Sequence, residues 1–236
     1  MYRRCLLVGT LTICCVGCGT ESTEPNAETD PKVVEQKPNC RRFTASAKLS
    51  GDLAGTATAS FDTKTNVYSL MIKSPEGEMV ANQHYASLAD FVAEAKAFGR
   101  TLITKDVEEE GGKQRTTTFT YDAKQRLTQK TRAEEKESRT AVFTAWDDKG
   151  RPTAGTKSAD YGCKGAPITI IYDDVARTRK ETIEDAKGVG CGDRLRVGTE
   201  TYDENGNVIL VDNDDGNGDG SKFTITVEKV IRVCTP

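Results

Sequence analysis

Tyr202-Asp203-Glu204-Asn205-Gly206-Asn207-Val208 joins an aromatic residue, an aspartate, a short polar run and an aliphatic residue. An aspartate at this place accepts backbone N–H bonds within a turn, and Gly or Asn tolerates a left-handed backbone. The flanking segments are rich in threonine and aliphatic residues, which favour strands. The stretch therefore predicts a β-hairpin whose turn begins at the aspartate.

An aromatic residue followed by aspartate occurs at four other places in the chain. These pairs are Phe61-Asp62, Tyr121-Asp122, Trp146-Asp147 and Tyr172-Asp173. The last four of the five pairs lie 25, 26 and 30 residues apart. One such hairpin does not bury its own face, so repeated copies are expected to pair side by side.

This pattern resembles the YD repeat of bacterial Rhs-type and related cell-surface proteins. In that repeat an aromatic residue and Asp precede a turn, then Gly-Arg or Gly-Asn, then an aliphatic residue. The resemblance covers residues 115–232 and, weakly, 55–73. It implies a mainly β fold, an antiparallel β-meander built from YD-like hairpin repeats. A plain meander whose turns share residues by chance is the alternative.

One segment departs from the strand pattern. Ser87-Leu88-Ala89-Asp90 is similar to a capping box, with Asp in place of the usual Glu. Apolar residues then follow helical spacing at positions 88, 91, 92, 95 and 98, and Gly99 is a natural stop. We expect one short helix packed on the sheet and a return to strand over 101–107. The runs 108–112 and 134–137, rich in glutamate, are expected to be charged turns.

The first 18 residues combine Arg3 and Arg4 with an apolar run that ends in Cys15-Val16-Gly17-Cys18. The run is too short to span a bilayer as a mature helix. It resembles a bacterial lipobox, in which a small residue precedes a cysteine that receives lipid. Cys15 departs from the usual Leu of that motif. The resemblance implies removal of residues 1–17 and lipidation of Cys18; an ordinary secretory signal is the alternative.

The remaining chain divides by composition. Residues 18–39 are polar and contain three prolines, so they predict a flexible tether. Residues 40–236 predict a single β-repeat domain, or alternatively a cap over 40–107 followed by repeats over 108–236. Gly19 after the lipidated cysteine resembles cargo sent to an outer membrane. We therefore expect a lipid-anchored protein of the bacterial outer membrane that faces the periplasm or the cell surface.

Four cysteines remain after the signal and the lipidated residue: Cys40, Cys163, Cys191 and Cys234. An even number in an exported domain predicts two disulfides, for which three pairings exist. We favour Cys40–Cys234, which would clamp the ends of the folded part, together with Cys163–Cys191.

The stretch 212–220 is dense in Asp, Asn and Gly and resembles calcium loops of the D-x-D-G-D-G kind. Closely spaced carboxylate and amide oxygens suit a hard cation. The candidate ligands of a weakly bound, structural Ca²⁺ are Asp212, Asp214, Asp215, Asn217 and Asp219. A solvated hairpin tip is the alternative.

Composition narrows the functional classes. Among 236 residues, Lys and Arg nearly balance Asp and Glu, giving a net charge of -3, which argues against a nucleic-acid partner. The chain has a single histidine, no G-x-S-x-G elbow and no phosphate-binding glycine loop. These features predict a protein that is not an enzyme.

The leading hypothesis is a lipid-anchored envelope protein that acts as a non-catalytic binding or scaffold module. Its partners would be the membrane, through the lipid, and a surface protein or glycan docking on sheet edges and exposed aromatic rows. One alternative is a carrier of lipid or another hydrophobic ligand, with Leu88, Phe91 and Phe98 facing that ligand. The other is a hydrolase acting on carbohydrate or peptide.

Overall fold

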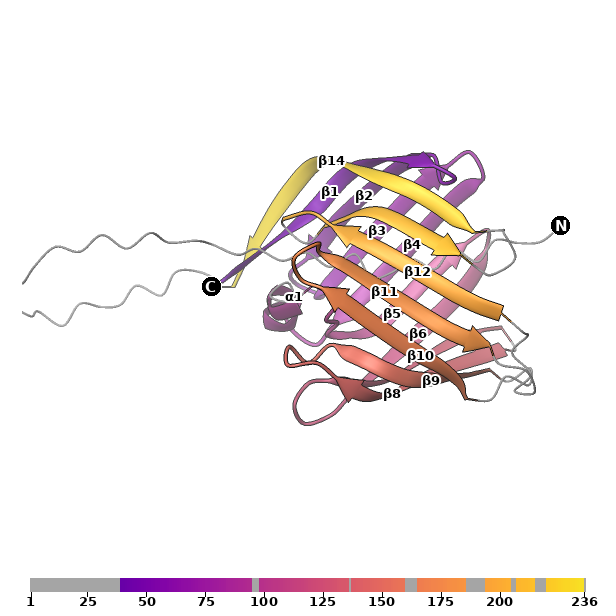
Figure 1. Ribbon diagram of the computed structural model, residues 1–236. Helices are drawn as coiled ribbons and strands as arrows, with labels where there is room; N and C mark the ends of the chain where they lie inside the picture. Colours follow the sequence, from indigo (N-terminus) through magenta and orange to yellow (C-terminus); the bar gives the residue numbers. More distant parts are fainter. Residues whose placement is uncertain are drawn as a thin grey trace, which may run out of the picture.

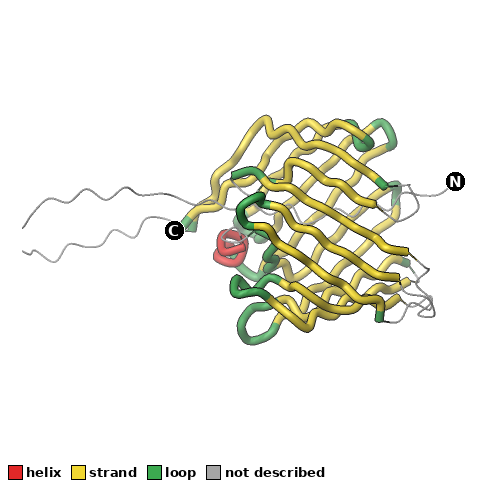
Figure 2. Tube along the Cα trace, in the orientation of Figure 1, coloured by secondary structure: helices red, strands yellow, loops and turns green. Residues whose placement is uncertain are grey.

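The computed structural model describes residues 39–94, 98–135, 137–159, 165–185, 194–204, 207–214 and 220–235. They form an antiparallel sheet that closes into a barrel, with one short helix at one end (Figures 1 and 2). The elements are β1 (Cys40–Gly51), β2 (Gly55–Asp62), β3 (Val67–Ser74), β4 (Gly77–Tyr85), α1 (Leu88–Glu94), β5 (Ile103–Glu110), β6 (Lys113–Tyr121), β7 (Leu127–Glu134), β8 (Glu137–Trp146), β9 (Pro152–Ala159), β10 (Ala166–Asp173), β11 (Thr178–Asp185), β12 (Arg194–Tyr202), β13 (Val208–Asp214) and β14 (Ser221–Cys234). A mainly β, antiparallel fold with one short helix is thus confirmed.

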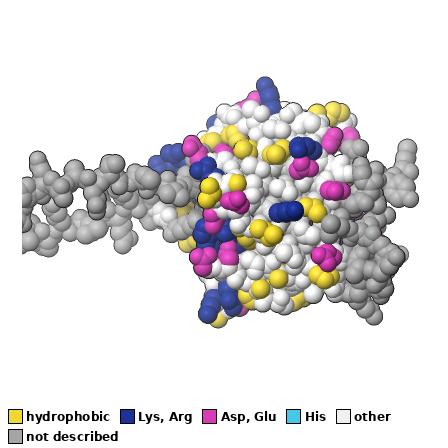
Figure 3. Space-filling view, viewed as in Figure 1, with side chains coloured by type: hydrophobic (Ala, Val, Ile, Leu, Met, Phe, Trp, Pro, Cys, Tyr) yellow, Lys and Arg dark blue, Asp and Glu magenta, His cyan; other side chains and the backbone are white. Residues whose placement is uncertain are grey.

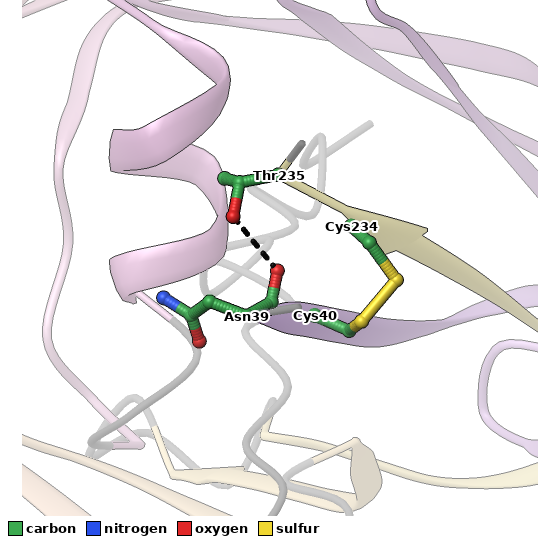
Figure 4. Close-up of a disulfide and its surroundings, with 4 residues drawn as sticks. All are labelled: Asn39, Cys40, Cys234 and Thr235. Carbon is green, nitrogen blue, oxygen red and sulfur yellow. Dashed lines mark hydrogen bonds between the residues drawn. A yellow bond between two sulfur atoms is a disulfide. The ribbon is translucent and has the colours of Figure 1, made fainter. Parts of the chain in front are cut away.

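The sheet closes because its first and last strands pair along nearly their whole length. The register of β1 with β14 runs from Cys40 opposite Cys234 to Gly51 opposite Phe223. The predicted disulfide Cys40–Cys234 joins the two strands, and the backbone oxygen of Asn39 accepts hydrogen bonds from Thr235 N and Oγ1 at 2.9 and 3.2 Å (Figure 4). The predicted antiparallel meander is therefore closed, a point that the sequence left open. Because its first and last strands pair with each other, the sheet edges on which we expected a partner to dock are paired within the barrel.

The connections between strands alternate between the two ends of the barrel. One end holds the disulfide and α1, and we call it the disulfide end; the other is the far end (Figures 1 and 2). The five aromatic-Asp pairs stand at the ends of β2, β6, β8, β10 and β12. Because all five are even-numbered strands of an up-and-down barrel, every one of these turns lies at the disulfide end.

The strands place threonine outside and apolar or charged residues inside. On β6, for example, Thr118 and Thr120 are exposed and alternate with inward-facing residues. Figure 3 shows hydrophobic side chains scattered singly over the face in view. The aromatic residues of the five pairs are buried or half-buried and pack against the core. The expected exposed aromatic rows are therefore wrong: these rings turn inward, where burial of their large area is favourable.

Two apolar clusters fill parts of the interior. The larger joins residues of β1–β4, α1 and β12–β14, and includes Phe43, Tyr68 and Phe91. The smaller joins residues of β7, β8, β10 and β11, and includes Phe143 and Ile168. Phe119 on β6 packs against both. Between and beyond these clusters, the inward positions are polar.

Candidate functional site

Helix α1 lies at the disulfide end, where it packs against β1 and β4. It starts as the sequence predicts, with Ser87 Oγ accepting the backbone N–H of Asp90 at 3.1 Å. Phe91 is completely buried: its ring stacks on Phe61 with centroids 3.8 Å apart and meets the Tyr85 ring edge-on at 5.2 Å. Within the described ranges, no helix has the length and apolar character to cross a membrane. The apolar side chains of α1 pack against the larger apolar cluster, and we call this helix the plug.

The positions that a hydrophobic carrier would turn toward its ligand pack against protein. Leu88 and Phe98 lie against the larger apolar cluster. The ring of Phe98 is 5.0 Å from that of Tyr202 and 6.1 Å from that of Tyr172. These contacts occupy the apolar surface of the plug.

A buried ion pair fastens the plug to β1. Arg41, next to the disulfide, lies 3.6 Å from Glu94 and donates to the backbone oxygen of Phe91 at 2.8 Å. Glu94 also accepts from Tyr85 Oη at 3.0 Å and from the backbone N–H of Leu102 at 2.6 Å. Both charged side chains are almost wholly buried, so each depends on these partners for its solvation.

Residues from two of the aromatic-Asp turns contact Phe98 and Gly99, which follow α1 in the chain. Arg151 pairs with Asp147 and Asp174 at 2.7 and 2.9 Å, and its guanidinium lies over the rings of Phe98 and Tyr172. Gly99 has φ +75°, and a Cβ there would lie 2.4 Å from the Tyr172 ring. Glycine is therefore required both by the backbone conformation and by the close approach of this ring.

Three of the aromatic-Asp turns share one hydrogen-bond pattern. Each has five loop residues, and its aspartate accepts the backbone N–H and a side-chain donor of the residue four positions later. The pairs are Asp122 with Arg126, Asp147 with Arg151 and Asp203 with Asn207, at 2.7–2.9 Å. The predicted role of aspartate as an acceptor within the turn is confirmed here.

The other two turns have four loop residues. Asp62 pairs directly with Val67, and Asp173 pairs directly with Thr178. Their left-handed residues are Asn66 and Arg177, one position later than Gln125 and Gly150 in the five-residue turns. The five copies that align in sequence thus form two turn types that differ in loop length. In the four turns whose left-handed residue the structure describes, they also differ in where the positive φ falls.

The other inward-facing residues of β5–β12 are largely ionisable, and we call this set the charged wall. Register fixes their orientation, because cross-strand partners share a face: Glu108 lies opposite Ala81, and Lys157 opposite Ala166, both buried alanines. The charged wall comprises Asp106, Glu108, Glu110, Lys113, Arg115, Lys130, Arg132, Glu134, Glu137, Arg139, Lys157, Arg179, Glu181, Arg196 and Glu200.

Ion pairs join much of the charged wall. Arg132 lies 2.8 Å from Glu108, and Arg115 lies 2.8 Å from Glu110 and 3.1 Å from Glu134. The side chains of Arg132, Glu134 and Glu110 nevertheless keep 24%, 28% and 41% of their surface exposed. Water therefore reaches inward-facing side chains of this wall. A barrel of about eight strands is just filled by its side chains, and this one has fourteen.

Among the acids of the charged wall, Asp106 has the pKa that is raised furthest from its ordinary value. Burial, with a further contribution from Glu108, raises its pKa to about 7, against the opposing effect of Arg132. In register it lies opposite Gln83, which is buried. Asp106 is thus partly protonated at neutral pH, as a carboxylic acid that is able to donate a hydrogen bond.

A group of bases lies on the neighbouring strands. Burial, together with the charges of Arg196, Lys130 and Arg139 and against the opposing effect of Glu181, lowers the pKa of Lys157 to about 8. Burial would raise the pKa of Glu181, but Arg179, Lys130 and Lys157 bring it down to about 2. The charges of these side chains therefore act on one another across the interior.

The described residues reach only part of the sites expected from the sequence. Several residues lie outside them, as does the signal predicted over 1–17: Cys18, Cys163, Cys191, Asp215, Asn217 and Asp219. Of the proposed calcium ligands, Asp212 pairs with Lys222 at 2.6 Å and Asp214 is exposed at the end of β13. The residues that the structure describes contain no group of three or more metal-ligating side chains. Calcium binding stays a prediction.

The charged wall was not predicted from the sequence. Residues 108–110 and 134 belong to strands β5 and β7, so the expectation that both glutamate-rich runs are wholly turns is wrong. A signal was present: in Lys130-Thr131-Arg132-Ala133-Glu134 the charged residues alternate with small ones. A period of two is typical of a strand whose faces differ, and here the charges mark the inner face.

No protein-family model matches this chain, and a search of curated proteins finds no similar sequence.

Proposed function

We propose that this protein is a lipid-anchored binding module of the bacterial cell envelope that holds a polar, charged ligand inside its barrel without converting it. The supporting observation is the charged wall, whose side chains face inward and yet contact water. A charge turned into a barrel loses hydration that it would keep on the outer face. The outer face of the same strands carries threonine instead. The charged side chains therefore lie on the inner face, where they would contact a ligand.

A polar ligand fits this interior better than a hydrophobic one. The apolar side chains around α1 are already buried against one another. The surface that stays in contact with water on the inner face belongs to arginine and glutamate. Lipid tails would bury these charges without giving them partners, which is costly.

The anchor in this proposal rests on the lipobox-like residues 15–18 and the polar tether over 18–39. The barrel begins at Cys40, directly after that stretch. A flexible chain of this length has a root-mean-square reach of about 25 Å. The barrel would therefore stay close to the membrane that holds Cys18. The YD-like origin of the hairpins belongs to the same proposal and is supported by the three turns of identical hydrogen bonding.

Native mass spectrometry of protein extracted gently from its own membrane tests this function. We expect loss of residues 1–17, an added lipid mass that Cys18→Ser abolishes, and a small polar molecule released on collisional activation. A barrel that consistently carries nothing non-covalent would count against a binding module. A non-covalent lipid would favour the carrier instead.

A further inference from the structure

We infer that the open edge of β14 is a dimer interface, at which it pairs with the same edge of a second copy of this chain. The interface lies on residues 226–234 of β14. It depends neither on a ligand inside the barrel nor on lipid at Cys18, so it goes beyond the proposed function.

Strand β14 is open on one side for most of its length. It pairs with β13 only as far as Thr224, whereas its pairing with β1 continues to Cys234. Strand β1 in turn pairs with β2 only from Ser46 onward. Among the described residues, 225–234 of β14 therefore pair only with β1, and 40–45 of β1 pair only with β14. The paired ends of the two strands form a ribbon that extends past the neighbouring strands at the disulfide end (Figure 1).

The ribbon turns β1 toward the barrel and β14 toward solvent. Residues 43–45 of β1 are all buried, although their side chains alternate between the two faces of the strand. The Thr44 hydroxyl donates to the side-chain oxygen of Asn207, which lies in the turn between β12 and β13. Residues 228–230 of β14, by contrast, are all exposed. The side of β14 away from β1 is therefore an accessible strand edge, with backbone N–H and C=O groups that another strand would pair.

The residues of this edge favour a strand as partner. The stretch 226–233 is rich in β-branched residues and contains no proline. Val230, in its middle, keeps 42% of its surface exposed. Natural proteins usually shield such an edge, because it is a template for pairing with another chain. We therefore expect an added strand to cover it.

The charges around Val230 complement themselves in one antiparallel register. Glu228 and Arg232 flank Val230 at a spacing of two, so all three side chains lie on one face. When two copies pair about a two-fold axis with Val230 opposite Val230, each Glu228 stands opposite Arg232 of the second copy. Thr226 then stands opposite Cys234, and the whole open stretch is paired. A second copy supplies this charge complementarity twice.

Both charged residues are available for the contact. Arg232 lies opposite Arg42 on β1, and both are exposed. Like charges directly opposite each other are unfavourable, so an acid on the open side of β14 would offset this repulsion. Glu228 lies 3.3 Å from Lys48, but both side chains are exposed, and such a surface pair contributes little. Glu228 therefore exchanges this partner for Arg232 of the second copy at small cost.

The first experiment measures dimer dissociation by analytical ultracentrifugation of the full-length protein extracted in detergent. Glu228→Arg and Arg232→Glu each place like charges opposite each other twice, so each should weaken the dimer about ten-fold or more. The double variant restores opposite charges and should dimerise within about three-fold of wild type. Lys48→Gln is the matched control: it breaks only the pair within one copy and should leave the dimer unchanged.

The second experiment tests the register by cross-linking. Val230→Cys places two thiols opposite each other on the two-fold axis and should give a disulfide-linked dimer under mild oxidation. Thr226→Cys is the control, because its side chain is also exposed but its two copies would stand roughly 27 Å apart along the paired strands. Wild type treated in the same way reveals any link through the native cysteines.

A wild-type protein that stays monomeric in concentrated solution would overturn the interface. Equal association of all the charge variants would overturn it too, because the copies would then meet elsewhere. So would cross-linking of Thr226→Cys as readily as Val230→Cys, or a different polypeptide captured at position 230. If a cysteine variant fails to fold, the charge variants still decide. The proposed function fails separately, when native mass spectrometry finds neither monomer nor dimer with a non-covalent ligand.

Discussion

Most inward-facing residues of β1–β4 are apolar, whereas many of those on β5–β9, β11 and β12 are ionisable. We call the first set, which includes Phe43, Ala47, Tyr68 and Leu70, the apolar wall; it buries itself against α1. The charged wall keeps part of its surface in water. Both walls belong to one continuous sheet with the same alternation of faces. The difference indicates that the apolar wall stabilises the barrel. Under the proposed function, the charged wall is the part of the interior that contacts the ligand.

The largest expected effect is the loss of the barrel's covalent closure. Replacing Cys40 and Cys234 by serine should lower the free energy of unfolding by about 5 kcal/mol, because the closed loop is long. Denaturant titration measures it. The matched variant Cys163→Ser with Cys191→Ser tests the second predicted bridge and should cost roughly 3–4 kcal/mol. A loss below about 1 kcal/mol for the first variant would mean that strand pairing alone closes the barrel.

The next largest effect concerns the apolar wall. Phe91→Ala should destabilise the protein by about 3–5 kcal/mol, because it removes the ring that stacks on Phe61 and contacts Phe43 and Tyr85. Val142→Ala is the control, since this side chain is 40% exposed, and it should change stability by less than about 0.5 kcal/mol. Equal effects of the two changes, measured by urea unfolding, would contradict a packed plug.

A substitution in the charged wall should raise the stability of the protein, whereas the substitutions above should lower it. The pKa of Asp106 is raised from its ordinary value to about 7, so the folded state favours the protonated acid. Its contribution to stability is complete below pH 3.8 and is lost as the pH rises through about 7. Asp106→Asn imitates the neutral acid and should stabilise the protein at pH 8.5 by roughly 2–4 kcal/mol.

The pH profile sharpens that test. The difference between Asp106→Asn and wild type should shrink toward zero as the pH falls to about 4. Glu109→Gln, on the exposed face of the same strand, should show no such profile. A gain of stability that does not depend on pH would rule out titration of Asp106 as its cause.

The smallest expected loss of stability comes from a substitution in an aromatic-Asp turn. Asp147→Ala removes acceptors for the backbone N–H groups of Lys149 and Arg151 and for the Arg151 guanidinium. We expect a loss of about 1–2 kcal/mol in thermal unfolding. The adjacent and exposed Asp148 is the control, and its change to Ala should be nearly neutral. If both variants lose the same stability, the turn hydrogen bonds are not the reason.

The sequence predicts what is local in this fold. The aspartates of the turns and the start of α1 at Ser87 follow from short-range chemistry, and the structure confirms them. The Cys40–Cys234 bridge was predictable because the two cysteines flank the folded part. Barrel closure was not, since it depends on how twist and register accumulate over all the strands.

The candidate site was less accessible to sequence reasoning. Lys130 and Lys157 become neighbours only through Ala141 on the strand between them, and Arg196 joins them through the curvature of the barrel. Alternation within each strand shows that one face is charged. It does not show which face turns inward, because soluble strands usually place charge outside.

The most direct test of the contrast between the walls is thiol labelling of single cysteines in the native protein. Thr117→Cys lies inward between Asp106 and Arg132 on the charged wall, Ala47→Cys lies inward on the apolar wall, and Thr118→Cys faces outward. With a small anionic reagent, we predict rapid labelling at 118, slower but complete labelling at 117 without unfolding, and labelling at 47 only after unfolding. Protection of 117 equal to that of 47 would contradict an interior that admits a polar ligand.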